Sequence, residues 1–577
     1  MTTTVRNIVN SARDLSKDGT WFRDSQGRYI LFRGVNFASR SKLPPYLPIA
    51  PLGSATIDQP RLKEEIESVK TELDLLKKLG FNIIRLLISW KAIEPKPNPD
   101  LNELMTEGEE YLTLVNQIIN ELYRRDLYII LDFHQDIAHE VYGGDGFPDW
   151  ALAIDKEHKR PKSSNLKDRK WQTAYIINKL VRHTLISFWK NDLTNEEIGL
   201  QNFPVRTHLE KTIGQTVKFF KSLNENSGHP AILGVEPFNE PHPAGIPAKD
   251  FEATFLYQYY QNVDLEIRRF DDKMFLFMEP RVDWTMSFQG AEKSKLGPSP
   301  FNIRRTFNLD FISNVMIEGK TDPKRIISDL PSDRVALDKI GGRGVLSFHY
   351  YDPIAIAQSF LKIPDNMYKY TREWPDVFDQ LVKAAREREL VPFLTEFGGV
   401  QDAELINDYI NLHYIQIESF LLNSTYWNYD LYNTSEGKDN WNLENFSLLG
   451  PGRRPRNIDV IARPYPLRSS ARPTLLTFDL ESRYFTLLLE GSVVDSPTIL
   501  YIPFDIHYSP EFRVWSTSRE IEWNRQNQLL YWYPAKDQTV NQIIVAKVGG
   551  SDVIDVERLP KKARDSAQKA TFVYTFS

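Results

Sequence analysis

The feature that most constrains this chain is the repeated alternation of buried-strand patterns with helix patterns. Short apolar segments rich in β-branched and aromatic residues recur from residue 30 onward, and most of them follow a segment with helically spaced apolar positions. Eight alternating units predict an α/β fold, a closed (β/α)8 TIM barrel rather than an open doubly wound sheet. The predicted strands are 30–35, 81–87, 127–133, 231–236, 274–278, 344–349, 392–396 and 424–428.

Long connections follow three of these strands, at 134–207, 279–343 and 429–465. They far exceed the usual length of about 2–6 residues for such loops. Loops that follow barrel strands build the active-site face, so we expect these three to form the walls of a site. Within the first, helically spaced apolar residues from Trp171 to Lys190 predict a helical lid. The helices predicted between the strands are 61–79, 109–125, 208–224, 251–269, 375–388 and 402–421.

The sequence pattern changes after Arg463-Pro464-Tyr465-Pro466. Short β-type runs replace the alternation and predict a C-terminal β-sandwich domain. We therefore expect four parts, a leader (1–19), the catalytic barrel (20–465), the β-sandwich (466–560) and a tail (561–577).

Composition excludes several functional classes. A net charge of −6 gives no electrostatic footprint for nucleic acid, and the absence of cysteine excludes disulfides and thiolate chemistry. No run of about 18 apolar residues occurs, so no transmembrane segment is expected, although transient contact with a membrane surface stays open. Because the first residues lack the apolar core of a signal peptide, we expect a cytoplasmic protein, with removal of a secretion signal as the alternative. The oligomeric state is left open.

Two glutamates end predicted strands and carry the functional prediction. Asn239 and Glu240 follow the strand 231–236, and Glu396 ends the strand 392–396. Cleavage of a glycosidic bond needs one group that protonates the leaving oxygen and one carboxylate on the other side of the anomeric carbon. We predict Glu240 as general acid and base, Glu396 as nucleophile, and Asn239 as a hydrogen-bond partner of the neighbouring sugar hydroxyl. The alternative for each glutamate is an ordinary exposed turn residue.

Two further charged residues, Arg85 and Glu279, are predicted to lie near Glu240 and Glu396. Arg85 lies in an apolar strand, where an unpaired charge is costly, so it needs a carboxylate partner; we predict Glu396, with a structural ion pair elsewhere as the alternative. Glu279 is a competing carboxylate at the fifth strand end. We predict that it positions substrate, because it lacks the Gly-Gly turn that follows Glu396.

Further polar and aromatic residues at strand ends complete the predicted site. His134 and Asp136 are expected to bind sugar hydroxyls; a metal site is disfavoured because His134 and His139 are five residues apart, not four. His349 and Tyr351 end the sixth strand, where a tyrosine hydroxyl could stabilise Glu396, and Trp427 could stack on a sugar ring; plain packing is the alternative for each aromatic residue. We expect no metal and no cofactor.

Taken together, these residues resemble the family five glycoside hydrolases. The pattern comprises Arg85, His134, Asn239-Glu240-Pro241, His349-x-Tyr351, Glu396 and Trp427 in chain order. Longer motifs resemble the glycolipid-cleaving branch that contains endoglycoceramidases, fungal-type glucosylceramidases and steryl-β-glucosidases. They are Asp132-Phe133-His134-Gln135-Asp136, the segment Gly143 to Trp150, the segment Ser347 to Pro353, and Thr395-Glu396-Phe397-Gly398-Gly399.

The resemblance implies a retaining β-glycosidase that acts on a glycolipid or another glucoside with an apolar aglycone, such as glucosylceramide or a steryl glucoside. It also implies a covalent glycosyl intermediate on Glu396. Two alternatives stay open. One is an endoglycoceramidase that releases intact oligosaccharide, and the other is a non-catalytic glycolipid-binding protein on the same scaffold.

Overall fold

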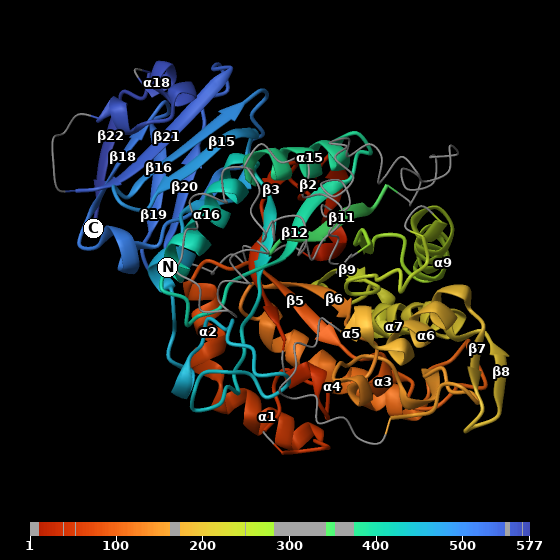
Figure 1. Ribbon diagram of the computed structural model, residues 1–577. Helices are drawn as coiled ribbons and strands as arrows, with labels where there is room; N and C mark the ends of the chain where they lie inside the picture. Colours follow the sequence, from red (N-terminus) through yellow and green to blue (C-terminus); the bar gives the residue numbers. More distant parts are fainter. Residues whose placement is uncertain are drawn as a thin grey trace, which may run out of the picture.

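The barrel is present and closed. A computed structural model describes residues 11–38, 40–51, 53–161, 174–247, 250–281, 342–351, 374–548, 554–567 and 569–577. Eight parallel strands form a ring, with each strand paired to the next and the last paired to the first (Figure 1). This confirms the predicted TIM barrel. The strands are β4 (Arg33–Phe37), β5 (Ile83–Ile88), β6 (Tyr128–Phe133), β9 (Ile232–Glu236), β10 (Phe275–Met278), β11 (Gly344–His349), β12 (Val391–Phe397) and β13 (Asn423–Tyr426).

Every residue of these eight strands is buried, as expected for strands covered by helices on one face and by the barrel interior on the other. This explains why they appear in the sequence as nearly continuous apolar runs. The helices between the strands are α1 (Gln59–Ser68), α2 (Lys70–Lys78), α3 (Trp90–Ile93), α4 (Thr106–Tyr123), α5 (Ala174–Ile177), α6 (Lys179–Lys190), α7 (Val205–Asn226), α9 (Tyr257–Arg268), α15 (Trp374–Arg386) and α16 (Ile406–Ser419).

The predicted helices are present in the structure, with small differences in their bounds. The predicted helix 61–79 is two helices, α1 and α2, which meet at Val69, and the helix predicted over 251–269 begins with a π-helical turn, Phe251–Leu256, before α9. The part of the predicted lid that the structure describes is helical, as α5 and α6, while Trp171 lies outside the described residues. Among the described helices, none has the length and apolarity to cross a membrane.

The first barrel strand begins later than predicted. Tyr29–Ile30 forms a separate short strand, β3, which pairs with the C-terminal domain, and the barrel strand β4 starts at Arg33. The prediction of a strand at 30–35 was therefore wrong at its start. The apolar run Tyr29-Ile30-Leu31-Phe32 is continuous, and a period-2 pattern does not show where a chain passes from one sheet to another.

The segment before β4 closes the base of the barrel. Ala12 and Leu15 are buried in one cluster with inward-facing strand residues such as Phe275 and Phe393. Ala12 also donates its backbone N–H to the carbonyl of Pro230, just before β9. The barrel interior is thereby sealed at the end opposite to the predicted site.

The C-terminal domain contains two antiparallel sheets whose inner faces share one apolar core. This confirms the predicted β-sandwich. The first sheet is formed by β1 (Ser16–Asp18), β2 (Trp21–Arg23), β3, β14 (Tyr465–Ser469), β17 (Thr498–Tyr501), β20 (Leu529–Tyr533) and β19 (Glu520–Asn524). The second is formed by β15 (Arg472–Asp479), β16 (Tyr484–Glu490), β21 (Val540–Lys547), β18 (Phe512–Ser516) and β22 (Phe572–Phe576). Strand pairing thus extends into the predicted leader through β1 and into the predicted tail through β22.

A buried ion cluster joins barrel and sandwich. Glu418 at the end of α16 accepts from Arg463 Nε at 2.7 Å and Nη2 at 3.1 Å. The same carboxylate lies 3.4 Å from Arg33 Nη2 of β4 and accepts the backbone N–H of Phe478 in β15 at 3.1 Å. All three charged side chains are at most 5% exposed, so each guanidinium depends on this one carboxylate for compensation.

We expect Glu418→Gln to lower the free energy of unfolding by about 3–5 kcal/mol, the cost of leaving buried charge unpaired. Chemical unfolding followed by circular dichroism would measure this loss. The matched control is Glu67→Gln, which removes an exposed partner of Lys70 and is expected to change stability by less than about 0.5 kcal/mol. Equal effects of the two substitutions would contradict a stabilising role for the cluster.

Candidate active site

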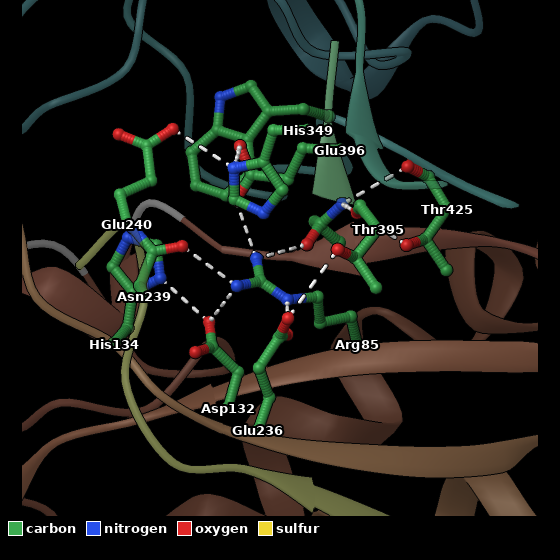
Figure 2. Close-up of polar contacts among 12 residues, drawn as sticks. Arg85, Asp132, His134, Glu236, Asn239, Glu240, His349, Thr395, Glu396 and Thr425 are labelled. Atoms are coloured by element: carbon green, nitrogen blue, oxygen red, sulfur yellow. Dashed lines mark hydrogen bonds and ion pairs between the residues drawn. The ribbon is translucent and has the colours of Figure 1, made fainter. Parts of the chain in front are cut away.

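The carboxyl ends of the barrel strands bring the predicted residues together. Side chains that are far apart in the sequence converge at this end of the ring (Figure 2). This is the end at which TIM barrels carry their chemistry. The residues are Arg85 in β5, His134 and Asp136 after β6, Asn239 and Glu240 after β9, Glu279 after β10, His349 and Tyr351 at and after the end of β11, Glu396 in β12, and Trp427 after β13.

The Arg85 guanidinium lies at the centre of the cluster and is fully buried. Its Nη1 donates to Glu396 Oε1 at 2.5 Å and to Asn36 Oδ1 at 2.9 Å. Its Nη2 donates to Asn239 Oδ1 at 2.8 Å and lies 3.1 Å from Asp132 Oδ2, while Nε donates to Glu236. The predicted contact between Arg85 and Glu396 is present, but Arg85 also forms ion pairs with other carboxylates.

Glu396 lies where β12 departs from regular pairing. The register with β11 shifts between Phe348 and His349, and the register with β13 shifts between Leu394 and Phe397. Such irregularities re-aim a side chain, which explains how a strand residue points into the mouth of the barrel. Besides Arg85, the Glu396 carboxylate accepts the Tyr351 hydroxyl on Oε2 at 2.8 Å.

Glu240 adopts a left-handed backbone conformation, with φ at 47°. For a residue with a side chain this costs about 1–3 kcal/mol and is concentrated at functional sites. The turn directs the side chain toward Glu396: one oxygen of each carboxyl and a ring nitrogen of His349 all lie within 4.8 Å of one another. Carboxyl groups in retaining glycosidases stand about 5–5.5 Å apart and in inverting ones about 6.5–9.5 Å, so this proximity favours retention.

The two glutamates experience different surroundings, although both are 5% exposed. Burial and the neighbouring Glu396 raise the pKa of Glu240 well above its ordinary value. Burial also raises the pKa of Glu396, but Arg85, His134 and the Tyr351 hydroxyl oppose this and limit the pKa to about 7. Glu396 therefore ionises first, and Glu240 keeps its proton.

His349 lies between the acids. Its Nδ1 is 3.0 Å from Glu240 Oε1 and 3.6 Å from Glu396 Oε2, and its Nε2 is 3.4 Å from Glu279 Oε1. Burial, reinforced by the charges of Arg85 and His134, holds the pKa of His349 well below its usual range. The imidazole is therefore neutral at physiological pH.

A second polar group lines the site beside Trp427. The His134 ring stacks on Trp427 with centroids 5.7 Å apart, and its Nδ1 and Nε2 lie 2.7 Å from Asp132 and 3.2 Å from Asp136. The Lys42 ammonium is paired with Asp136 and lies 4.7 Å from the Trp427 ring centroid and 3.7 Å from that of Trp441. The ammonium of Lys42 and the ring of His134 thus lie against the indoles, and the charged donors and acceptors of this group suit the hydroxyls of a sugar.

The same region contains groups with the spacing of metal ligands, such as His134, Asp136 and Asp145. Burial alone would lower the pKa of Lys42, but Asp136 and Asp145 raise it above its ordinary value. The ammonium therefore stays charged and already supplies a cation to these carboxylates. We assign no metal to this group.

Comparison with known proteins identifies the family. The family model "Cellulase (glycosyl hydrolase family 5)" matches residues 59–433, and the "Glycoside hydrolase family 5 C-terminal domain" matches residues 463–545. The chain belongs to glycosyl hydrolase family 5. Hydrolases of this family are retaining, so this family 5 chain is a retaining glycoside hydrolase.

Several relatives have more specific names. The family 5 chain is 23% identical to endoglycoceramidase I of Rhodococcus hoagii over 513 residues, which cover 87% of this chain and 82% of that protein. It is 28% identical to a glucosylceramidase of Rhizopus delemar over 270 residues, 41% of this chain and 37% of that protein. Its fold is similar to the crystal structure of sterylglucosidase 1 of Cryptococcus neoformans, with a TM-score of 0.67 at 15% identity, covering 94% and 98% of the two chains.

Sequence reasoning missed several residues of the family 5 site. Glu236 and Asn36 bind Arg85 from within strands, and Lys42 binds Asp136 from the loop after β4. A carboxylate at the end of the apolar run Ile232-Leu233-Gly234-Val235 was a usable signal for Glu236, because a buried acid needs a cation. Lys42 has no comparable signal in its local sequence.

We expect Glu396→Gln to raise the melting temperature at pH 8 but not at pH 4. Burial raises the pKa of Glu396 to about 7, whereas an unfolded glutamate titrates near about 4.3. Below pH 4 the Glu396 carboxyl is protonated in both the folded and the unfolded chain, so its ionisation does not affect the stability. Between pH 4 and pH 7 only the unfolded chain loses it, so the wild-type protein loses stability and the variant does not.

Calorimetry at the two pH values measures the difference, with the exposed Glu67→Gln as control. A shift in melting temperature of the same size at pH 4 and pH 8 would contradict a raised pKa for Glu396.

Proposed function

We propose that this chain hydrolyses the β-glucosidic bond between a sugar and an apolar aglycone by double displacement, with Glu396 as nucleophile and Glu240 as acid and base. The single observation that carries the assignment is the difference between the two carboxyl environments. Glu396 is held by the guanidinium of Arg85 and the hydroxyl of Tyr351. Glu240 Oε2 is buried and has no hydrogen-bond partner in the described part of the chain.

In the first step, ionised Glu396 attacks the anomeric carbon while Glu240 transfers its proton to the departing oxygen. A covalent glycosyl-Glu396 ester forms and the aglycone leaves as an alcohol. In the second step, Glu240, now a carboxylate, takes a proton from water, whose oxygen attacks the anomeric carbon and releases Glu396. We assign to Asn239, which accepts from Arg85 on its Oδ1, the role of binding the sugar hydroxyl next to the anomeric carbon.

The substrate proposal is a glucoside with a lipid aglycone, glucosylceramide or a steryl glucoside. It is supported by relatives named glucosylceramidase and ergosteryl-beta-glucosidase. Longer glycolipids are the second candidate. The observation in its favour is that the similarity to an endoglycoceramidase extends over 87% of the chain, including the C-terminal domain.

We expect Glu396→Gln to lose at least about 10³-fold in turnover, because the covalent step has no nucleophile. Azide should restore activity on an activated β-glucoside and yield the α-glucosyl azide, since azide then attacks from the face that Glu396 occupies. The matched control is Glu240→Gln, which should give the β-glucosyl azide from the intact covalent intermediate. Nuclear magnetic resonance of the products distinguishes the two anomers, and identical anomers from both variants would exclude these roles.

We expect the wild-type protein to release free glucose from glucosylceramide and to leave the lactose unit of lactosylceramide attached to its ceramide. Chromatography of the released sugars measures this. Release of intact lactose would establish the endo reaction instead. Tight binding of either glycolipid without any released sugar would support the non-catalytic alternative.

A further inference from the structure

Glu236, the last residue of β9, is a buried carboxylate to which the double displacement assigns no step. We propose that Glu236 is a positioning residue that acts through Arg85, because it fixes the orientation of the guanidinium and takes up part of the positive charge that Glu396 would otherwise receive. It thereby sets the pH at which the nucleophile ionises. This inference rests on the proposed function, which makes Glu396 the nucleophile.

Both carboxylate oxygens of Glu236 contact protein groups. Oε2 accepts from Arg85 Nε, and Oε1 accepts the Thr395 hydroxyl at 3.5 Å (Figure 2). The side chain has 0% exposure. A sugar in the mouth of the barrel therefore has no free surface of this carboxylate to bind, and Glu236 affects catalysis through its two partners.

The contact with Arg85 determines which way the guanidinium faces. A guanidinium is planar and its donors have fixed directions, so a carboxylate that holds Nε also sets the directions of Nη1 and Nη2. Nη1 then donates to Glu396 at 2.5 Å, and Nη2 donates to Asn239, the neighbour of the acid catalyst, at 2.8 Å. Glu236 thus orients one cation toward both halves of the catalytic pair.

The contact with Thr395 leads to the nucleophile along the chain. Thr395 directly precedes Glu396 in β12, and its backbone carbonyl accepts from Asn36 Nδ2 at 2.9 Å and from the Thr425 hydroxyl at 2.6 Å. The pairing of β12 with β13 is irregular between Leu394 and Phe397. Side-chain hydrogen bonds, and not the regular ladder alone, therefore hold the strand where the nucleophile lies.

Several acidic groups share the charge of Arg85. Asp132 and Glu236 occupy paired positions on β6 and β9, and both form ion pairs with the guanidinium. Glu236 also lies near Glu279 after β10 and His349 of β11. The ionisable groups that face Glu396 itself are Arg85 of β5, Lys42 after β4, His134 after β6, Glu240 after β9, His349 at the end of β11 and Tyr351 after it.

The shared charge has a consequence for the nucleophile. Burial raises the pKa of Glu396 to about 7, although Arg85 opposes the rise. Because Glu236 lies against the same guanidinium, its negative charge reduces the positive potential at Glu396. A neutral residue at position 236 leaves more of that potential for Glu396 and favours its carboxylate form. The pKa of Glu396 should then fall, and the enzyme should be active at lower pH.

The test measures kcat/KM for 2,4-dinitrophenyl β-glucoside as a function of pH in the wild-type protein and in Glu236→Gln. This leaving group departs without a proton, so the acidic limb of the profile reports the ionisation of the nucleophile in the free enzyme. We expect that limb to move to lower pH by at least about one unit. Because the amide oxygen still accepts from Arg85 Nε, kcat/KM on the plateau should stay within about tenfold of wild type.

Glu236→Leu separates orientation from charge, since it has a similar volume but no acceptor. The acidic limb should move as in Glu236→Gln, whereas the plateau should fall by at least a further tenfold or so, because nothing then holds the Nε edge of the guanidinium. Circular dichroism shows whether each variant is folded. If neither neutral variant folds, Glu236→Asp, which keeps the charge and withdraws the carboxylate by one methylene, should lower the plateau and keep the wild-type acidic limb.

Glu418→Gln is the matched control. It removes another buried carboxylate that is paired with guanidinium groups, at the junction with the sandwich, and it is expected to lower stability. Assayed below its unfolding transition, it should keep the acidic limb of the wild-type profile. A shift in Glu236→Gln without one in Glu418→Gln therefore cannot come from lost stability.

An acidic limb at the wild-type position in folded Glu236→Gln would overturn the proposal, and so would an equal shift in Glu418→Gln. A folded but inactive Glu236→Gln would overturn it as well, because the amide retains the contact with Arg85. For Glu236→Asp, a plateau equal to that of wild type would have the same meaning. Absence of turnover of this glucoside by the wild-type protein would instead contradict the proposed function.

Discussion

The site depends on one buried cation. Arg85 is fully buried inside the barrel, and within about 3.4 Å of its guanidinium lie oxygens of Asp132, Glu236, Glu279 and Glu396. Carboxylates brought together in a dry interior repel each other strongly, and only a planar group with several donors satisfies many of them at once. Lysine, with a single compact charge, has no equivalent geometry. The Arg85 guanidinium therefore offsets the mutual repulsion of the carboxyl groups that lie at the mouth of the barrel.

The distribution of that positive charge also separates the functions of the acids. Glu396 contacts Arg85 directly and ionises first, whereas Glu240 has no hydrogen bond to Arg85 among the described residues and keeps its proton. In the proposed function, one kind of side chain thus supplies both the nucleophile and the proton donor. The chemistry is determined by where each carboxyl lies relative to one guanidinium and one neutral imidazole.

Much of this could be predicted from the sequence, because barrel strands leave a strong local signal and polar residues at their ends lie near each other in any such ring. Arg85, Asn239, Glu240, His349 and Glu396 were all predicted in this way to share one site, and the structure brings their side chains together. The residues that were missed interact over long sequence distances: Lys42 pairs with Asp136, and Asn36 holds Arg85. Neither is distinguished by its neighbours in sequence. Local patterns also did not reveal the irregular pairing around Glu396 or where the chain passes from β3 into β4.

The first strands of the described chain belong to a sheet of the C-terminal domain. β1, β2 and β3 lie within residues 16–30, yet β3 pairs with β14, which begins at Tyr465, and β1–β3 form one side of that sheet. During synthesis this three-stranded meander is complete more than 400 residues before its partner strand β14 emerges. The same amino-terminal stretch plugs the barrel, so catalytic ring and sandwich have no clean boundary at which either could be separated intact from the other. Evolutionary gain or loss of the C-terminal module would therefore have to alter the amino terminus at the same time.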